Sequence, residues 1–275
     1  TYNLQGVNNL FFAFQSSANT PITTFYTSPD GITWTSRTLP AAYGMQNVVY
    51  ASTIGRYACI GSNSSTSYST NNVLSSTDGF TWTAYTLPNQ GTWSNIAASP
   101  TRFVACSGAA YPSGSVSTNV VYSTNGTTWT TGNRVNSSNN AWTFYNPGDT
   151  YFYATNAFTG GPERSTDGIT WANYSTGIMS YVGNSVSYSL FVKGTPTIGT
   201  INGTNYYVFS GNNSNIAIST DGINWTSGTM LGLYSHPLVI YNNRIIVTGS
   251  NANNVQYTLF TPAAFGLYAG PGTII

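Results

Sequence analysis

Short runs of mainly apolar residues recur along the chain at intervals of about 40 to 55 residues, a repeat length typical of stacked structural units. Val, Ile, Phe and Tyr dominate these runs, and Gly, Asn and other polar residues bound them. No stretch keeps the 3.6-residue period of an amphipathic helix, so each run predicts a β-strand. The six runs are residues 10–16, 56–62, 102–108, 150–156, 205–211 and 244–250.

The second repeat shows how such a run fits into a larger unit. The strands expected there are residues 47–52, 56–62, 72–77 and 80–88. Asp78-Gly79 separates the last two, and Asp-Gly pairs favour tight turns between antiparallel strands. Six units of this kind predict an all-β protein, a six-bladed β-propeller with four antiparallel strands in each blade.

One domain covers residues 1–275 in this interpretation. A four-stranded sheet of this size cannot bury both of its faces alone, so each blade is expected to pack against a neighbour on either side. The approximate blades are residues 1–40, 41–88, 89–134, 135–177, 178–229 and 230–275.

A seven-residue motif, Ser-x-Asp/Asn-Gly-x-Thr/Asn-Trp, occurs five times, starting at Ser28, Ser76, Ser123, Ser165 and Ser219. We call each copy a box. The Asp or Asn side chain can accept hydrogen bonds from N–H groups of its own turn, and Gly supplies the positive φ that a tight turn needs. In the third copy Asn125 replaces Asp. An Asn side chain can accept the same hydrogen bonds in a turn, but it serves poorly as a general acid or a metal ligand. The boxes therefore predict scaffold elements, with Trp packed between sheets; the residues concerned are Asp30, Trp34, Asp78, Trp82, Asn125, Trp129, Asp167, Trp171, Asp221 and Trp225.

The box resembles the Asp-box, or bacterial neuraminidase repeat, of sialidase-like β-propellers. Each copy here lacks one residue that the usual family pattern has between Asp and Gly. The resemblance extends over the whole chain through its repeats and implies a propeller fold. Catalytic sialidases bind their acidic sugar through three arginines opposite the boxes, and here only Arg134 and Arg164 are candidates for that face.

Few residues are charged: 5% of the 275, with a formal net charge of +1. A typical soluble domain has about 25%. Without a basic cluster we expect no nucleic-acid binding. No apolar run approaches the roughly 18 residues that a membrane span needs, so no membrane insertion is expected.

Neutral Asn, Ser, Thr, Gly and Tyr take the place of charged residues. This composition is similar to that of phage tail-fibre, head-fibre and other virion-surface proteins. The resemblance implies an extracellular or virion-surface location, with a host-surface receptor or other virion subunits as partners. A neutral hydrogen-bonding surface also suits a neutral carbohydrate.

Ligand binding is expected on the face opposite the boxes. Antiparallel strands alternate in direction, so the loops between second and third strands share that face with the blade-to-blade connections. These segments are long and polar and carry aromatic residues, as binding loops on a rigid scaffold often do. Aromatic rings can stack on the C–H faces of sugars. The candidate ligand-binding residues are Tyr43, Tyr68, Trp93, Tyr111, Trp142, Tyr181, Tyr234 and His236.

Some of these aromatic residues have a second interpretation, as wedges that pack between blades. For Trp93 and Trp142 the sequence leaves both interpretations open. Tyr68 and Tyr111 lie in polar loops and are expected to be exposed. His236 precedes Pro237 and is expected mainly to pack or to form hydrogen bonds where the chain enters a blade.

Catalysis is not expected from the residues available. Glycoside hydrolysis usually needs two carboxylates, and outside the boxes the chain offers only Asp149 and Glu163, on opposite faces of the expected sheets. His236 has no obvious carboxylate partner for a Ser-His-Asp arrangement. No Cys/His cluster suits zinc and no acidic loop suits calcium, so neither a metal nor a cofactor is expected.

The sequence thus favours a non-catalytic binding propeller that recognises a neutral carbohydrate or a host-surface receptor. Two alternatives stay open. One is a structural virion or appendage protein that contacts other subunits, and the other is a divergent glycosidase.

Overall fold

A computed structural model describes residues 2–15, 22–62, 70–108, 120–133, 142–145, 151–156, 163–173, 197–210, 215–221, 226–229, 238–241, 244–251 and 254–260. Every regular element in these segments is a β-strand, which confirms the all-β prediction. None of these segments contains a helix suited to crossing a membrane. The chain divides into two compact units, unit 1 (Thr1–Ala154 and Glu163–Asn173) and unit 2 (Thr155–Pro162 and Tyr174–Ile275).

Fourteen strands, β1 to β14, build unit 1, with the end of β12 reaching into the segment assigned to unit 2. They are β1 (Tyr2–Val7), β2 (Leu10–Gln15), β3 (Ile22–Ser28), β4 (Thr35–Ala51), β5 (Arg56–Ser62), β6 (Thr70–Ser76), β7 (Thr83–Ser99), β8 (Arg102–Gly108), β9 (Val120–Ser123), β10 (Thr130–Thr131), β11 (Trp142–Tyr145), β12 (Phe152–Asn156), β13 (Glu163–Ser165) and β14 (Ala172–Asn173). Strands β1 to β10 pair in chain order, and β11 to β14 form a separate four-stranded sheet. All described pairs in unit 1 for which a register is given are antiparallel.

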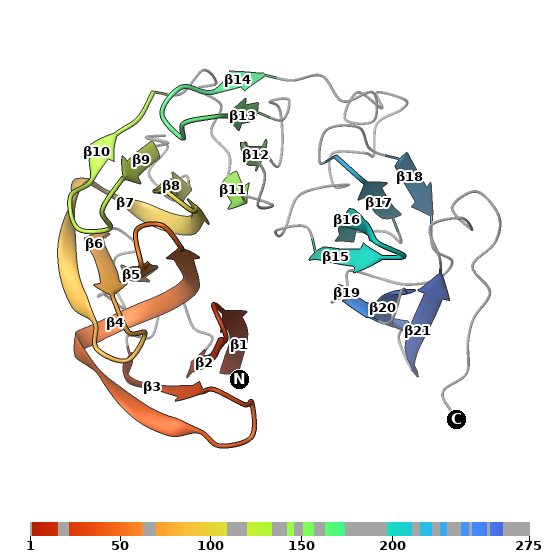
Figure 1. Ribbon diagram of the computed structural model, residues 1–275, viewed down its shortest axis with the longest axis horizontal. Helices are drawn as coiled ribbons and strands as arrows, with labels where there is room; N and C mark the ends of the chain where they lie inside the picture. The colour runs from red at the N-terminus through yellow and green to blue at the C-terminus, as the bar shows by residue number, and fades with distance from the viewer. Residues whose placement is uncertain are drawn as a thin grey trace. The chain divides into compact units, whose positions relative to one another are not determined.

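Strands β4 and β7 each take part in two successive sheets (Figure 1). In β4, Thr35–Thr38 and Tyr43 pair with β3, and the last residues, Gly44–Ala51, pair with β5. We therefore speak of a first sheet (β1, β2, β3, start of β4), a second (end of β4, β5, β6, start of β7), a third (end of β7, β8, β9, β10) and a fourth (β11–β14). The connections expected near residues 40 and 88 are continuous strand, with register shifts where the strand bends.

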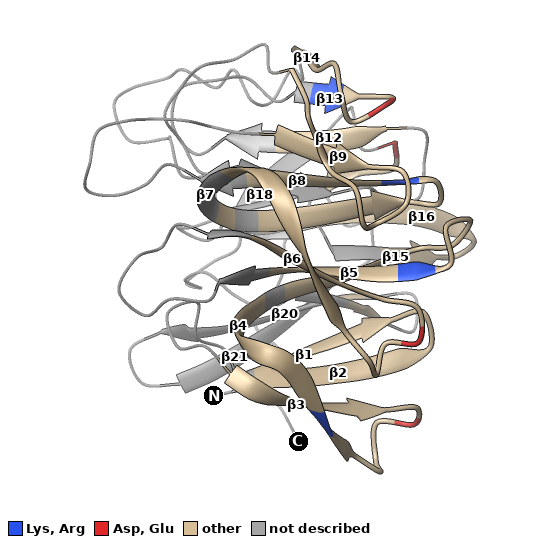
Figure 2. Ribbon diagram, turned by 90° about the vertical axis from the view of Figure 1, so that its left-hand side faces the viewer, with Lys and Arg blue, Asp and Glu red and all other residues tan. Residues whose placement is uncertain are grey.

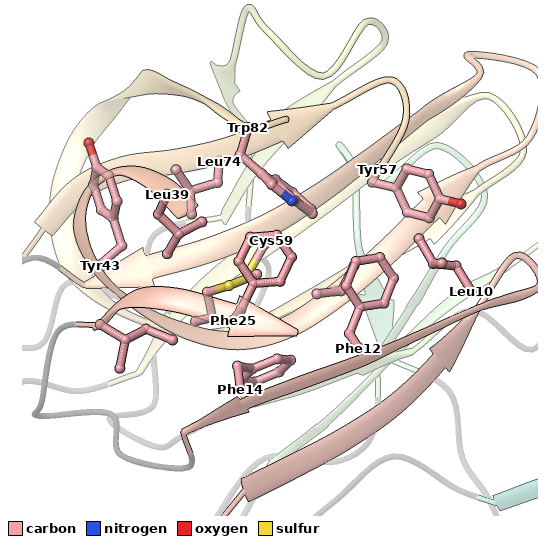
Figure 3. Close-up of a cluster of buried hydrophobic side chains, with 13 residues drawn as sticks. Leu10, Phe12, Phe14, Phe25, Leu39, Tyr43, Tyr57, Cys59, Leu74 and Trp82 are labelled. Carbon is pink, nitrogen blue, oxygen red and sulfur yellow. The ribbon is translucent and has the colours of Figure 1, made fainter. Parts of the chain in front are cut away.

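The hydrophobic core of unit 1 lies between neighbouring sheets. Phe12 and Phe25 of the first sheet face Trp82, the box tryptophan of the second, with ring centroids 6.3 and 6.4 Å apart in edge-to-face geometry (Figure 3). Trp129 belongs to a buried cluster that includes residues of the second sheet, and Trp171 to one that includes residues of the third. Each of these box tryptophans therefore covers the sheet that precedes its own.

The first box departs from this pattern. Trp82, Trp129 and Trp171 are 4%, 6% and 1% exposed, whereas Trp34 is 37% exposed. Within unit 1 no sheet precedes the sheet that carries Trp34, so the predicted burial of this tryptophan is not seen in that unit and stays a prediction for the whole chain. Trp225 lies outside the described residues.

Unit 2 contains two antiparallel sheets. The fifth sheet has β15 (Thr197–Ile201), β16 (Thr204–Ser210), β17 (Asn215–Ser219) and β18 (Thr226–Thr229), and the sixth has β19 (Leu238–Tyr241), β20 (Arg244–Asn251) and β21 (Asn254–Phe260). Ile201, Val208 and Ile218 of the fifth sheet form a buried cluster with Ile245 of the sixth. The described strands thus form six antiparallel sheets in chain order.

Candidate functional site

The box turns hold their polar groups within themselves. In the first box, Ser28 Oγ donates to Asp30 Oδ1 (2.8 Å) and accepts a hydrogen bond from the Gly31 N–H (2.8 Å). Asp30 Oδ1 also accepts from the N–H groups of Ile32 and Thr33, each at 2.8 Å. Four hydrogen bonds therefore close one short turn, and the carboxylate is occupied by its own backbone.

The other boxes repeat this geometry. Asp78 and Asp167 accept two backbone N–H groups and a serine hydroxyl at 2.7–2.9 Å. Asn125 does the same with its side-chain oxygen, at 2.8–3.1 Å. Ser219 donates to Asp221 at 2.9 Å. Because an amide oxygen replaces a carboxylate without changing the turn, these hydrogen bonds agree with the predicted role as a turn acceptor.

Hydrogen bonding also keeps the box carboxylates ionised. The N–H of Thr33, then that of Ile32 and the Ser28 hydroxyl, lower the pKa of Asp30 from 3.8 to about 2. Burial raises the pKa of Asp78 and of Asp167, but the backbone and serine hydrogen bonds outweigh it, and both pKa values are lowered. A carboxyl group of this kind has no proton to donate near neutral pH, so it is unsuited to general acid catalysis.

Arginines link neighbouring sheets beside the box turns. Arg102 of the third sheet donates from Nη1 to the main-chain oxygen of Asp167 in the fourth. Arg56 of the second sheet lies against the third box, where a Cβ atom on Gly126 would come within 3.0 Å of its Cδ. Figure 2 shows the red acidic turn residues along one edge of the sheets. This edge is built from side chains that already serve the scaffold.

The opposite edge is where second strands lead to third strands. In the second sheet, β5 and β6 are joined there by residues 63–69, and the box turn joins β6 to β7 at the other end. Tyr68 and Tyr111 fall in such connections, whereas Tyr181, Tyr234 and His236 fall between one sheet and the next. All five lie outside the described residues. Trp142 is the first residue of β11.

Two of the predicted ligand-binding residues are buried. Tyr43 is 8% exposed on β4, and Trp93 is 2% exposed on β7. Both lie in cores between sheets, Tyr43 with the first core cluster and Trp93 with the second. Their burial agrees with the packing interpretation and leaves little ring surface for a sugar.

A row of side-chain amides lies on β1 and near the ends of β4 and β7. These are the inner strands of the first three sheets in the ribbon of Figure 1. Gln5 Nε2 donates to Asn47 Oδ1 (2.8 Å), and Asn47 Nδ2 donates to the main-chain oxygen of Ile96 (3.0 Å). Gln5 Oε1 accepts the Val48 N–H (2.8 Å). The row therefore joins three successive sheets through uncharged polar groups.

Asn95 extends this row with an unsatisfied acceptor. It lies four residues before the end of β7, as Asn47 lies four residues before the end of β4. Asn95 Oδ1 is buried and has no hydrogen-bond partner in the structure. By register, Val49 stands in the second sheet where Gln5 stands in the first, so the donor that serves Asn47 has no counterpart. A buried water molecule would supply it.

The amide row was not among the residues predicted from the sequence. Its one sequence signal is the shared position of Asn47 and Asn95 ahead of two equivalent runs, and the contact with Gln5 spans 42 residues of chain.

Among the described residues no group of three His, Cys, Asp or Glu side chains is placed to hold a metal ion. Glu163 begins β13, and Asp149 lies outside the described residues.

No protein-family model matches the chain, and no curated protein matches it. Solved structures do match it over nearly its whole length. Virginiamycin B lyase from Staphylococcus aureus is 14% identical with a TM-score of 0.62, covering 99% of this chain and 84% of that one. A streptogramin B lyase is 14% identical with a TM-score of 0.63, covering 100% of this chain and 83% of that one.

A third match is the GH74 xyloglucanase from Xanthomonas campestris, 11% identical with a TM-score of 0.59, covering 98% of this chain and 47% of that one. These proteins are β-propellers. Together with the repeated four-stranded sheets, they establish the predicted β-propeller fold for this chain.

The same structures correct two expectations. Two are lyases and one is a glycosidase, so this fold accommodates enzymes, and the prediction that the chain is not an enzyme is wrong in excluding catalysis. The compositional resemblance to phage virion-surface proteins finds no support among them.

Proposed function

We propose that this β-propeller binds a neutral carbohydrate at the edge of the sheets opposite the boxes. The proposal includes a single ring of six blades of the Asp-box type, built from the six sheets, and a location outside the cell that makes the protein.

One observation carries the proposal: the amide row of Gln5 and Asn47, with the unsatisfied oxygen of Asn95 at its end. The Asn95 acceptor is buried, so an enclosed water is its natural donor, and the partly buried amides of Gln5 and Asn47 are the groups within reach of a sugar hydroxyl. Neutral amides pair with sugar hydroxyls without the desolvation cost that a charged group carries. Only 5% of the chain is charged, which further supports an uncharged ligand.

Two further points support the choice of edge. The box turns use their serine and aspartate side chains internally, so little polar capacity is left there for a ligand. The opposite edge receives the Asn-, Ser- and Tyr-rich connections that include Tyr68 and Tyr111. A xyloglucanase shares the fold, which makes soluble xyloglucan a concrete first probe.

A glycan array that includes xyloglucan oligosaccharides tests the proposal. We expect binding to neutral glycans by the wild-type protein. Tyr111→Ala should weaken that binding about tenfold or more, as for loss of one ring contact in a carbohydrate site. Asp78→Asn, a change in a box, serves as the matched control and should bind as wild type. Measuring reducing ends after incubation separates binding alone from hydrolysis.

The proposal fails if no neutral glycan binds. It also fails if changes at Arg56 or Arg102, on the box edge, remove binding while Tyr68→Ala and Tyr111→Ala leave it intact. A protein that binds no glycan but associates with other protein subunits would support the structural alternative instead.

A further inference from the structure

Three box glycines each lie against one residue of the preceding sheet. A Cβ atom on the glycine would come within 4 Å of that residue, and the pairs are Gly79 with Leu10, Gly126 with Arg56 and Gly168 with Arg102. The three contacting residues hold one register position, because each directly precedes the residue that pairs with the box serine of its own sheet. Of these three boundaries, the one at Gly126 combines an arginine with a box that carries no charge.

At the fourth box, the arginine meets an acidic turn. Arg102 Nη1 donates to the main-chain oxygen of Asp167. Burial raises the pKa of Asp167, but hydrogen bonds within the turn and the charge of Arg102 outweigh it, so the pKa is lowered. This boundary therefore holds a cation beside an anion of the same chain.

At the third box, the anion is missing. Asn125 stands where Asp167 stands in the fourth box. The side-chain oxygen of Asn125 accepts three hydrogen bonds from its own turn, at 2.8–3.1 Å. Asn125 is exposed, and its Nδ2 makes no hydrogen bond within the part of the chain that the structure describes. The turn therefore presents a free N–H donor to solvent where an aspartate would present its second oxygen.

Arg56 brings an unused cation to this turn. A Cβ atom on Gly126 would lie 3.0 Å from Arg56 Cδ and 3.1 Å from Phe103 Cε2, so the aliphatic part of Arg56 packs where the second sheet meets the third. Its guanidinium makes no hydrogen bond and no ion pair with any described residue. Because a guanidinium stays charged near neutral pH and has several N–H donors, the packed arm holds a cation with free donors beside the free amide of Asn125.

We infer that Arg56 and Asn125 form a binding site for a carboxylate. The guanidinium can donate two parallel hydrogen bonds to the two carboxylate oxygens, and Asn125 Nδ2 supplies a further donor. The ligand thus provides the anion that Asp167 provides at the fourth box. The site is partly exposed, so its affinity is weak and falls with salt. It lies on the box edge and does not depend on the carbohydrate site proposed for the opposite edge.

Acetate titration followed by NMR of the arginine Nε–Hε signals tests this site, with sodium chloride used to keep the ionic strength constant. Arg56→Gln identifies the Arg56 signal by its loss. We expect the Arg56 signal to shift with acetate and to saturate. The Arg102 signal is the matched control and should shift far less, because that side chain already donates to the fourth box. Acetamide, the uncharged analogue of acetate, should cause no saturable shift.

Asn125→Asp is the decisive variant, because it places a carboxylate beside Arg56 and the same turn closes with Asp in the second and fourth boxes. In this variant the acetate concentration at half-saturation should rise about fivefold, the upper range for an exposed ion pair. Absence of a saturable Arg56 shift in the wild-type protein overturns the inference. So do equal shifts at Arg56 and Arg102, an Arg56 titration that Asn125→Asp leaves unchanged, or an acetamide shift equal to that of acetate, because none of these results needs a carboxylate site.

Discussion

Removal of one box tryptophan tests how much the box turns contribute to stability. Trp82 is 4% exposed, and its ring meets Phe12 and Phe25 edge-on at 6.3 and 6.4 Å. Its Nε1 donates to the main-chain oxygen of Gly79 (3.1 Å). Trp82→Ala removes all of these contacts and leaves a cavity between two sheets, so we expect a loss of about 3–5 kcal/mol in the free energy of unfolding.

Phe80→Ala, in the same turn, is the matched control. Phe80 is 37% exposed and its ring lies under the guanidinium of Arg37, 4.2 Å from the centroid. Its removal should cost about 1 kcal/mol or less, since an exposed cation–π contact contributes little. Urea denaturation followed by far-UV circular dichroism measures both variants. A loss below about 1 kcal/mol for Trp82→Ala, or equal losses for the two variants, would refute the scaffold role of the box.

Three further predictions concern the box turns. Asp78→Ala should lower the free energy of unfolding by about 1–2 kcal/mol in the same urea titration, as for loss of a capping side chain. Asp78→Asn should lower it by less than about 0.5 kcal/mol, because Asn125 makes the same hydrogen bonds in the third box. The pKa of Asp30 is lowered from 3.8 to about 2, so its contribution to the free energy of unfolding is full above pH 3.8 and is lost as pH falls towards 2. Asp30→Asn should flatten this part of an acid denaturation profile. An unchanged profile would contradict the role given to Asp30. Gly168 and Gly55 both have φ of +68°, but a Cβ atom on Gly168 would clash with Val104 and one on Gly55 would meet no atom within 4 Å. In thermal unfolding, the Gly168→Ala variant should therefore be about 1–3 kcal/mol less stable than the Gly55→Ala variant.

Much of the fold could be predicted because its signals are local. The apolar runs at 56–62 and 102–108 coincide with β5 and β8. β-Branched and aromatic residues bounded by turn residues are a local signal for such strands. The box turn is equally local, since its hydrogen bonds join residues two or three positions apart.

Features that depend on neighbouring sheets could not be predicted. A blade boundary is expected after residue 40, yet β4 runs through it. Pro40 falls in the register shift between Thr38 and Tyr43, which both pair with β3, so its missing N–H interrupts no regular ladder. Trp34 and Trp82 have nearly identical local sequences and differ in burial only because of the sheet before them. The candidate site depends on contacts such as that of Gln5 with Asn47, which no local pattern encodes.

The central claim is that the boxes hold the scaffold and that the ligand binds elsewhere. One measurement tests it most directly: the Kd for a glycan identified on the array, determined by isothermal titration calorimetry for a variant in which Asp30, Asp78, Asp167 and Asp221 are all replaced by Asn. The third box already works with Asn125, so the account predicts a folded protein whose Kd lies within about twofold of wild type, a difference of less than about 0.5 kcal/mol. A folded variant whose affinity falls tenfold or more would place the ligand at the boxes and contradict the account.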